Sequence, residues 1–475
     1  MRRMLAVVLA CAGALFGPGA HSSSAQVTRT GTAVAADRDL LAAVDSIAAV
    51  ALARGPIAGL SVAVVRGDSS IVSSGYGFAD LENRVPATAA TIYDIASVTK
   101  LLTAVAVLRL VEEGRLRLED EVATLLPGFP GGEQGGRITV RHLLSHTSGL
   151  PDYEEADTER WLAAGTRLTD RFVLDFLRDR PLDFEPGSRW SYSNSGYYLL
   201  ALILRRITGQ EFGRHIREAV AMPVGMTDTA PCDDVRAPER LTRGYEAAGD
   251  SLLPGRLYAL PGLVGDGGLC STIGDLARLP GALRRGRAVT DATFARMTQA
   301  TALASGVSVD YGLGVRRGTL EGHALWGHTG GMSTFWSALV HYVESGTTIV
   351  VLVNTDGGAE DALTIEGEIA RVVLGLDEPV LLDEFPLQEE ARSFQGRYAD
   401  GTGEVVVESD GVRLQRVVPT SMSSPRTLLY QGRDVFGWSE YPMDRLLFHR
   451  VGGRVVGLSE YYNGVFATYR HAASR

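Results

Sequence analysis

The sequence predicts an α+β fold, in which strands from the two ends of one domain pair in an antiparallel sheet and a helical lobe lies between them. Strand-like runs at residues 59–78 and 323–356 bracket a long middle of helix-and-loop character. A helical pattern flanks each set of strands, at residues 37–54 and 360–374. From residue 394 to the end, short alternating runs with Gly-Arg and Asp-Gly turns predict a second, smaller antiparallel β domain.

The expected elements follow from local patterns taken in chain order. Apolar residues recur at helical spacing over residues 37–54, and residues 59–78 read as two strands joined by a Gly-Asp turn. A long helix is expected from near Ser97 to near Gly114, and another over "GYYLLALILRRITG", residues 196–209. Residues 333–356 read as two strands around a Glu-Ser-Gly turn. These elements place the main domain at residues 38–375.

Both ends of the chain are expected to lie outside that domain. Residues 1–25 carry two arginines, an apolar run and then small residues, which is typical of a secretory signal peptide. We therefore expect an exported protein, either periplasmic or secreted. Residues 376–392 are acidic and contain prolines, which predicts a linker, and residues 393–475 remain as the C-terminal β domain.

Charge and cysteine content limit the kinds of partner that the chain is expected to bind. The formal net charge of −10 argues against nucleic acid and against an anionic membrane surface, and no run after residue 25 is long enough to span a bilayer. Cys232 and Cys270 remain after export, where an oxidising compartment allows one disulfide, but the sequence leaves this pairing open. Neither cysteine has a metal-type neighbour. We expect a monomer with no metal and no cofactor.

The stretch "YDIASVTKLL", residues 93–102, contains the only lysine of the chain. Of the 46 lysine and arginine residues, 45 are arginine, and Lys100 is the exception. Arginine keeps its proton at any accessible pH, whereas a desolvated lysine can lose it. Lys100 is also the only charged residue between Asp94 and Arg109, so burial should lower its pKa and suit it to act as a base. The alternative is an arginine-rich composition in which one lysine survives by chance.

Ser97 lies three residues before Lys100, so the two side chains share one face of the predicted helix. Ser97 also falls in the first turn, where free backbone N–H groups and the helix dipole favour negative charge. These conditions suit a nucleophilic serine whose proton passes to a neutral lysine while a backbone donor stabilises the oxyanion. The pattern S-x-x-K is common by chance, so the hypothesis needs support from other motifs.

A second polar motif, "RWSYSNSGYY", places Tyr192 and Asn194 just before an apolar helix. A tyrosine near a lysine can pass a proton to a leaving group, and an asparagine can hold a substrate amide. The alternative is that Asn194 is only a helix cap or a turn residue.

A third motif, "WGHTGGMSTFW", ends a predicted strand at a pair of glycines, which lets a backbone approach a ligand closely. Its polar and glycine positions are His328, Thr329, Gly330 and Gly331. The alternative is a tight strand end with a hydrogen-bonded histidine.

S-x-x-K, Y-x-N and [KH]-T-G occur in this order, and in this the chain resembles the penicillin-recognising serine hydrolases. These include class C β-lactamases, D-alanyl-D-alanine peptidases, D-aminopeptidases and related esterases. The resemblance covers residues 40–375 and extends to "ITVRHLLSHTSGLPDY" (138–153), "EPGSRWSYSNSGYYLLALILRRITG" (185–209), "MPVGMTDT" (222–229) and "GGLCSTIGDLAR" (267–278). It implies a β-lactamase/DD-peptidase-like fold, and the C-terminal segment is similar to the lipocalin-like β domain of some members.

The resemblance implies an acyl-enzyme mechanism. Ser97 would attack a carbonyl, Lys100 would accept its proton, and Tyr192 would pass protons to the leaving group and then activate water. Asn194 would orient the acyl amide of the substrate. The backbone N–H groups of Ser97 and Gly331 would form the oxyanion hole. The substrate-binding positions would be Asn194, His328, Thr329, Gly330 and Gly331, with His328 and Thr329 lining the cleft and binding a carboxylate or a leaving group.

One departure from the lactamases shifts the expected substrate. They carry lysine where this chain has His328, and a histidine is a weaker anchor for the carboxylate of a penicillin because it is only partly protonated near neutral pH. We therefore expect activity on small peptides, D-amino-acid amides or esters, peptidoglycan fragments among them. A β-lactamase is the first alternative. A catalytically silent cell-wall or peptide-binding protein is the second, although every expected catalytic position is filled.

Two other classes are disfavoured by their missing signatures. His142 and His146 have the spacing of paired zinc ligands on a helix, but the glutamate of H-E-x-x-H is absent. The G-x-S-x-G motif of an α/β-hydrolase does not occur in the chain.

Overall fold

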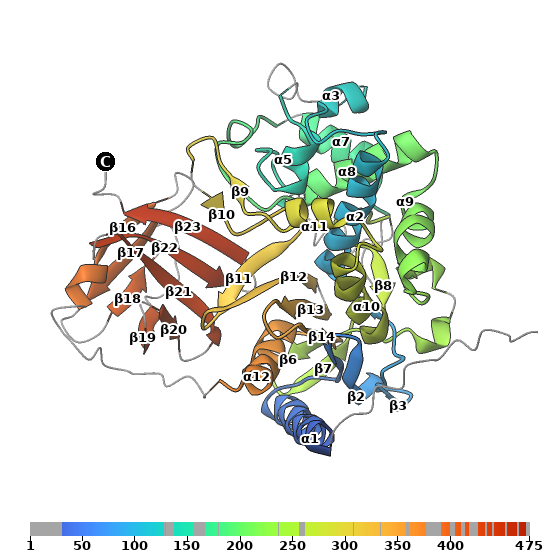
Figure 1. Cartoon of the computed structure of the whole chain (residues 1–475), viewed down its shortest axis with the longest axis vertical. Coiled ribbons are helices and arrows are strands. Elements are labelled where there is room, and N and C mark those ends of the chain that lie inside the picture. Colours follow the sequence, from blue (N-terminus) through green and yellow to red (C-terminus); the bar gives the residue numbers. More distant parts are fainter. Residues whose placement is uncertain are drawn as a thin grey trace, which may run out of the picture.

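The computed structural model describes most of the main domain and the strands of the C-terminal domain (Figure 1). The described residues are 31–127, 129, 137–155, 167–178, 180–235, 237–255, 262–306, 308–332, 334–357, 361–376, 391–399, 404–409, 414–417, 426–432, 435–438, 441–451, 454–462 and 465–471. The predicted signal peptide, residues 1–25, and most of the predicted linker lie outside them. None of the described helices has the length and apolar character needed to cross a membrane.

Seven antiparallel strands form the main sheet, and both ends of the domain contribute to it, as the sequence predicts. Their order is β11-β12-β13-β14-β1-β2-β3. The first strand, β1, pairs with its neighbour β2 on one side and with the late strand β14 on the other, where Val62 faces Val351. The strand bounds are β1 (Gly59–Arg66), β2 (Ser69–Asp80), β3 (Val85–Pro86), β11 (Arg316–Leu320), β12 (His323–Met332), β13 (Phe335–Tyr342) and β14 (Thr347–Val353).

Helices cover both faces of this sheet, which explains why its central strands are apolar on both sides. All seven residues of β14, "TTIVVLV", are buried. Helices α1 (Gly31–Arg54) and α12 (Ala362–Leu374) pack together and contact the sheet on one face. Helix α10 (Ile273–Arg284) contacts β1 and β14 from the larger core that continues into the helical lobe. Figure 1 shows α1 and α12 on one side of the strands and α2, α8 and α10 on the other.

Helix α2 (Thr99–Glu112) lies at the centre of the helical lobe and contacts α8. Its first ten residues, 99–108, are all buried, and Lys100 is one of them. The remaining helices of the lobe are short, apart from α8. They are α3 (Val122–Leu125), α5 (Val140–Leu144), α7 (Asp170–Arg178), α8 (Asn194–Thr208), α9 (Phe212–His215) and α11 (Asp291–Met297), together with the single turns η2 (Tyr153–Glu155) and η4 (Met222–Val224) and the π-helical turn η3 (Ile216–Ala221).

A three-stranded sheet joins the segment before Ser97 to the middle of the chain. Its order is β4-β8-β5, where β4 spans Tyr93–Asp94, β8 spans Leu269–Ser271 and β5 spans Ala230–Pro231. Cys232 and Cys270 form a disulfide here, with their Cα atoms 4.9 Å apart. The pairing that the sequence left open is therefore present. Two smaller sheets complete the domain: β15 (Thr355–Asp356), β6 (Tyr245–Ala248) and β7 (Ser251–Pro254), and the pair β9 (Thr301–Ala302) and β10 (Ser308–Val309).

The C-terminal strands close into an antiparallel barrel around an aromatic core. Phe394 packs against Phe436 and Phe448, with ring centroids 5.1 and 4.8 Å apart, and Tyr398 packs against Phe448. Strand β21 contacts helix α12 of the main domain. The strands are β16 (Gly396–Ala399), β17 (Glu404–Ser409), β18 (Leu414–Val417), β19 (Arg426–Gly432), β20 (Val435–Trp438), β21 (Tyr441–Val451), β22 (Arg454–Tyr462) and β23 (Val465–His471).

Candidate active site

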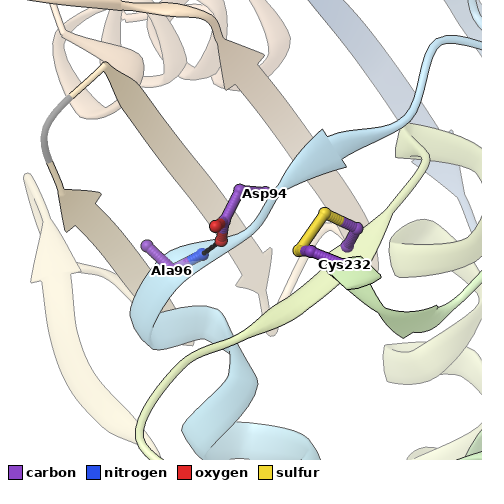
Figure 2. The surroundings of a disulfide bond; sticks show 4 residues. Asp94, Ala96 and Cys232 are labelled. Atoms are coloured by element: carbon purple, nitrogen blue, oxygen red, sulfur yellow. Dashed lines mark hydrogen bonds between the residues drawn. A yellow bond between two sulfur atoms is a disulfide. The ribbon is translucent and has the colours of Figure 1, made fainter. Parts of the chain in front are cut away.

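Ser97 lies on the short 3-10 turn η1 (Ala96–Val98), between strand β4 and helix α2. The chain enters this turn through Ala96 at a φ of 45°, a left-handed conformation that is uncommon for residues other than glycine. Figure 2 shows what holds it: Oδ1 of the buried Asp94 accepts a hydrogen bond from the backbone N–H of Ala96 at 2.8 Å. The backbone N–H of Ile95 donates to the Leu269 carbonyl at 3.0 Å. The turn thus presents a half-buried Ser97 at the start of α2.

Lys100 is fully buried, and its amine contacts three oxygens. Nζ lies 3.0 Å from Ser97 Oγ, 2.6 Å from Asn194 Oδ1 and 2.9 Å from the carbonyl oxygen of Asp266. The last two oxygens can only accept hydrogen bonds. A neutral amine has two N–H groups and one lone pair, so its two donors serve these acceptors and the lone pair is left for the proton of Ser97.

The pKa of Lys100 is lowered from 10.5 to about 8, because burial penalises the ammonium form. The carboxylates of Asp266, Glu154 and Asp152 oppose this shift by stabilising the charged amine. A lysine with such a pKa can take up and release a proton close to neutral pH, which is the property a general base needs.

Asn194 and Tyr192 reach the same amine from the segment that begins helix α8. Asn194 is held by Asp152, whose Oδ2 accepts from the Asn194 backbone N–H at 2.9 Å and from Nδ2 at 3.1 Å. This leaves Asn194 Oδ1 facing Lys100. The ring of Tyr192 lies with its centroid 4.8 Å from Lys100 Nζ. Burial raises the pKa of the Tyr192 hydroxyl, with a smaller opposing contribution from a hydrogen bond with Ser97, so it is a proton donor in the resting site.

Strand β12 brings the third motif alongside Ser97. A Cβ on Gly330 would lie 2.5 Å from the Ile95 carbonyl oxygen and 2.8 Å from the Ser97 backbone nitrogen, so only glycine allows this approach. His328 is buried, and both of its ring nitrogens have hydrogen-bond partners: Nδ1 and the Thr329 carbonyl are 2.6 Å apart, and Nε2 and the Tyr311 hydroxyl 2.9 Å. Burial lowers the pKa of His328 well below its usual value, so the imidazole is neutral.

The structure thus brings the predicted residues together from segments far apart in the chain. Ser97, Lys100 and Asn194 are joined by hydrogen bonds, Tyr192 lies over the lysine, and the strand of His328, Thr329, Gly330 and Gly331 lies beside the serine. His142 and His146, weighed as zinc ligands, lie in separate environments. His142 Nδ1 accepts from the Thr139 backbone N–H in the capping box of α5, and the His146 ring contacts aromatic side chains.

Sequence reasoning missed Arg316, which carries a positive charge into the site from strand β11. Its guanidinium carbon lies 5.6 Å from the centroid of the Tyr192 ring, and its backbone pairs with Gly327, next to His328. Its Nε is buried without a hydrogen-bond partner, and none of the ion pairs among the described residues includes it. In a chain with 45 arginines nothing marked this one, and only the adjacent glycine-rich "YGLGV" could have drawn attention to it.

Asp152 and Asp266 were also missed as neighbours of the lysine. Asp152 orients Asn194, and the side chain of Asp266 is buried beside the carbonyl that binds Lys100. Among the described residues, the only group of side chains close enough to hold a metal ion is Asp94, Cys232 and Cys270. Both sulfurs of that group are in the disulfide (Figure 2).

Comparison with known proteins decides the family. The sequence model of the family described as Beta-lactamase matches residues 44–374, more than half of the chain. The chain belongs to this family. It is therefore a serine hydrolase of the β-lactamase and penicillin-binding protein group, and the α+β fold predicted from the sequence is confirmed.

Individual members of the family resemble the chain over most of its length. Penicillin-binding protein 4* of Bacillus subtilis is 28% identical over 381 residues, which cover 75% of this chain and 83% of that protein. The D-amino acid amidase of Ochrobactrum anthropi SV3, solved in complex with L-phenylalanine amide, is 26% identical with a TM-score of 0.62 and covers 71% of this chain and 99% of its own. An octameric penicillin-binding protein homologue from Pyrococcus abyssi, 24% identical with a TM-score of 0.63, covers 92% of this chain and 98% of its own and shows the fold alone.

Proposed function

We propose that this β-lactamase family member is an exported acyl-enzyme hydrolase that cleaves small peptides, D-amino-acid amides or esters through Ser97, Lys100 and Tyr192. The observation that carries the proposal is the sole lysine of the chain, fully buried and 3.0 Å from a serine hydroxyl. The likeness to a D-amino acid amidase supports amide substrates. The lowered pKa of Lys100, about 8, favours a catalytic base over a protein that only binds cell-wall peptides, because binding alone does not require a lysine that can lose its proton.

The proposed reaction uses each of the three residues once per half-reaction. Ser97 Oγ attacks the substrate carbonyl carbon while its proton passes to the lone pair of Lys100. The bond to the leaving group breaks, the leaving group takes a proton from the Tyr192 hydroxyl, and the Lys100 ammonium restores that proton. Water then attacks the acyl ester on Ser97, giving its proton to the Tyr192 oxygen as the Tyr192 proton passes to the neutral Lys100. The bond to Ser97 Oγ breaks, the acid departs, and the Lys100 ammonium returns the proton to Ser97 Oγ.

Arg316 indicates that the substrate carries a carboxylate. A guanidinium beside the Tyr192 ring, with no ion-pair partner among the described residues, is a site for a carboxylate, to which it can donate two parallel hydrogen bonds. The neutral His328 cannot supply that charge. Peptides with a free C-terminus, including peptidoglycan fragments, fit this chemistry. A β-lactamase is the second candidate, and the same arginine favours it because every penicillin carries a carboxylate.

The decisive test of the function is covalent labelling of the full chain. We expect a fluorescent fluorophosphonate and a fluorescent penicillin each to leave an adduct on Ser97, mapped by mass spectrometry. Ser97→Ala should abolish both adducts. Lys100→Arg, which keeps the charge and loses the basicity, should slow turnover by about 10² to 10⁴. Labelling by the fluorophosphonate alone would favour an esterase or amidase without penicillin recognition. An unlabelled Ser97 would contradict the proposal and leave a binding protein.

The carboxylate preference is tested with Arg316→Gln and a pair of substrates, one peptide with a free C-terminus and the same peptide amidated. We expect kcat/KM for the free peptide to fall by about 10- to 100-fold, as for a lost charged hydrogen bond, and kcat/KM for the amidated one to change little. Arg317→Gln is the matched control, because Arg317 points to the other face of the strand and pairs with Asp310 at 3.7 Å. An equal loss on both peptides would rule out carboxylate binding.

Export and a monomeric state are also proposed. The signal-peptide pattern of residues 1–25 supports export, and N-terminal sequencing of the protein recovered outside the cytoplasm checks the cleavage after Ala25. The oligomeric state is measured by light scattering of the purified chain, since the Pyrococcus abyssi homologue is octameric.

A further inference from the structure

His146 contacts the Tyr192 ring and the backbone of both residues that flank Tyr192 in the chain, and the mechanism above gives it no role. Its backbone carbonyl accepts from the Ser191 N–H at 2.9 Å, and its ring Nδ1 accepts from the Ser193 N–H at 3.1 Å. These are the residues directly before and after Tyr192. The His146 ring also stacks on the Tyr192 ring, with centroids 4.3 Å apart and an interplanar angle of 31°. One buried residue thus fixes the backbone and the ring of the proton donor.

The backbone of His146 is itself held in an uncommon conformation. Its φ is 56°, in the left-handed region that residues other than glycine rarely adopt. Such a conformation persists only where its surroundings impose it, and these positions gather at functional sites. Here it allows the carbonyl and the ring of one residue to face the same segment, the loop that carries Tyr192.

A chain of hydrogen bonds connects His146 to strand β12, and its polarity can be worked out. Nδ1 of His146 accepts a hydrogen bond, so the proton of the neutral ring is on Nε2, which donates to the Tyr311 oxygen at 3.2 Å. Nδ1 of His328 contacts a carbonyl, which can only accept, so the His328 proton is on Nδ1. Nε2 of His328 must then accept the single proton of Tyr311, at 2.9 Å. Each group therefore donates to the next one along, from His146 through Tyr311 and His328 to the Thr329 carbonyl.

The surroundings keep both imidazoles neutral, as this polarity requires. Burial is the largest cause that lowers the pKa of His146 and of His328 well below the usual value. The positive charges of Lys100 on α2 and Arg316 on β11 act on both rings in the same direction. The other titratable groups that face them are neutral hydroxyls, those of Tyr192, Tyr197 and Tyr311.

We propose that His146 is the positioning residue for Tyr192, and that the chain His146–Tyr311–His328 fixes it against strand β12. The inference rests on the proposed function, because it assumes that Tyr192 transfers a proton. It also assigns His328 a task other than binding a substrate carboxylate: its ring ends the chain and ties it to the Thr329 carbonyl. The motif containing Tyr192 and the strand beside Ser97 then move as one unit.

The first test does not depend on activity. In the full chain labelled with ¹⁵N in its histidine rings, NMR near pH 7 should show His146 protonated on Nε2 only and His328 on Nδ1 only. Tyr311→Phe should change the Nε2 signal of His328, which loses its donor. Tyr245→Phe is the matched control, since Tyr245 is equally buried and its hydroxyl bonds to Glu82 and the Leu81 N–H. The opposite tautomer at either histidine, or a charged ring, would overturn the proposed hydrogen-bond chain from His146 to His328.

The second test separates positioning from general stability with two butyrate esters. Phenol is a poor leaving group that needs the Tyr192 proton, whereas p-nitrophenol leaves without it. Both esters give the same butyryl-enzyme, so the comparison uses kcat/KM, which reports only the steps up to acylation. Tyr311→Phe and His146→Ala should lower kcat/KM on phenyl butyrate by about 10-fold or more and change kcat/KM on p-nitrophenyl butyrate by less than about 3-fold. His146→Asn should recover part of the loss, because asparagine tolerates a positive φ and offers an acceptor to the Ser193 N–H. Equal losses on both esters, or none, overturn the positioning role.

Failure of the proposed function has a different signature. In that case Ser97→Ala would retain ester hydrolysis, or a fluorophosphonate would not reach Ser97, while the NMR tautomers stayed as described. A wild-type chain that turns over neither ester also contradicts the positioning role, whatever the tautomers are.

Discussion

Asp266 is the buried charge that most strongly opposes the loss of the Lys100 proton. The residue is 2% exposed, Oδ2 accepts a hydrogen bond from the Tyr153 hydroxyl, and Oδ1 has no partner among the residues that the structure describes. Burial raises the pKa of Asp266 to about 6, so above that pH it is a carboxylate close to the amine. It therefore keeps the pKa of Lys100 from falling further than about 8.

Asp266→Asn should move the pH profile of the enzyme. The substitution removes a negative charge, which lowers the pKa of Lys100, and the base works only when it is neutral. The acid limb of kcat/KM should therefore shift to lower pH, by roughly one unit or more. Asp275→Asn is the control, because Asp275 is also buried but has no part in setting the pKa of Lys100. A limb that stayed in place or moved to higher pH would contradict this electrostatic role.

At the scale of elements, helix α12 buries an acidic residue against the sheet. Glu366 is 2% exposed, the Tyr342 hydroxyl lies 3.4 Å from its Oε2, and its Oε1 has no hydrogen-bond partner in the part of the chain that the structure describes. Burial raises the pKa of this carboxyl from 4.5 to about 8, so in the folded chain it is protonated at neutral pH. In the unfolded chain it ionises above pH 4.5. The stability that it contributes is fully present below about pH 4.5 and is lost as the pH rises through about 8.

Glu366→Gln should therefore stabilise the protein at neutral pH and have little effect in acid. A glutamine stays neutral in both states, so the free energy of unfolding at pH 7 should rise by about 2 to 3 kcal/mol relative to wild type. Urea unfolding at pH 5 and pH 7.5 measures the difference. Glu368→Gln on the same helix is the control, because its side chain is partly exposed and pairs with Arg54 at 3.2 Å. A larger gain at pH 5 than at pH 7.5 would refute the linkage.

Sequence patterns predicted the main elements well, because apolar periodicity follows burial. The two strands at residues 59–78, the helix at 196–209 and the strands at 333–356 correspond to β1 and β2, α8, and β13 and β14. The helix expected from Ser97 differs at its start, where a 3-10 turn precedes α2. The cause is the positive φ of Ala96, which the buried Asp94 holds. Asp94 does carry a turn signal, because an aspartate can accept a hydrogen bond from the N–H two residues on, but Ala96 carries none for its left-handed conformation.

At the scale of the whole molecule, the site is assembled by contacts between distant segments. Lys100 bonds to Asn194 and Asp266, which lie 94 and 166 positions away. The motifs identified Ser97, Lys100 and Tyr192 because each has a chemical pattern around it. Arg316 and His146 have none: one is an arginine among many, and the other was weighed only as a zinc ligand. Their places depend on how α5, α8 and β11 meet, which no local pattern encodes.

The two domains also differ in how much of their structure local sequence patterns predict. Alternating short runs predicted antiparallel strands after residue 394, and these strands are present. Their closure into a barrel, with β16 pairing to β23, depends on pairing between the first and last strands. Strand alternation carries no information on closure, since an open sheet has the same alternation. Figure 1 shows the barrel beside the main domain. Strand β21 of the barrel contacts helix α12.

The single lysine makes the chain unusual toward reagents that acylate amines. Apart from an α-amine, Lys100 is the only amine of the chain, and it is fully buried at the catalytic serine. Coupling to a resin or a dye through amines will thus attach the folded protein by its terminus in one orientation. A label found as an amide on Lys100, as distinct from an ester on Ser97, marks molecules whose catalytic centre has opened.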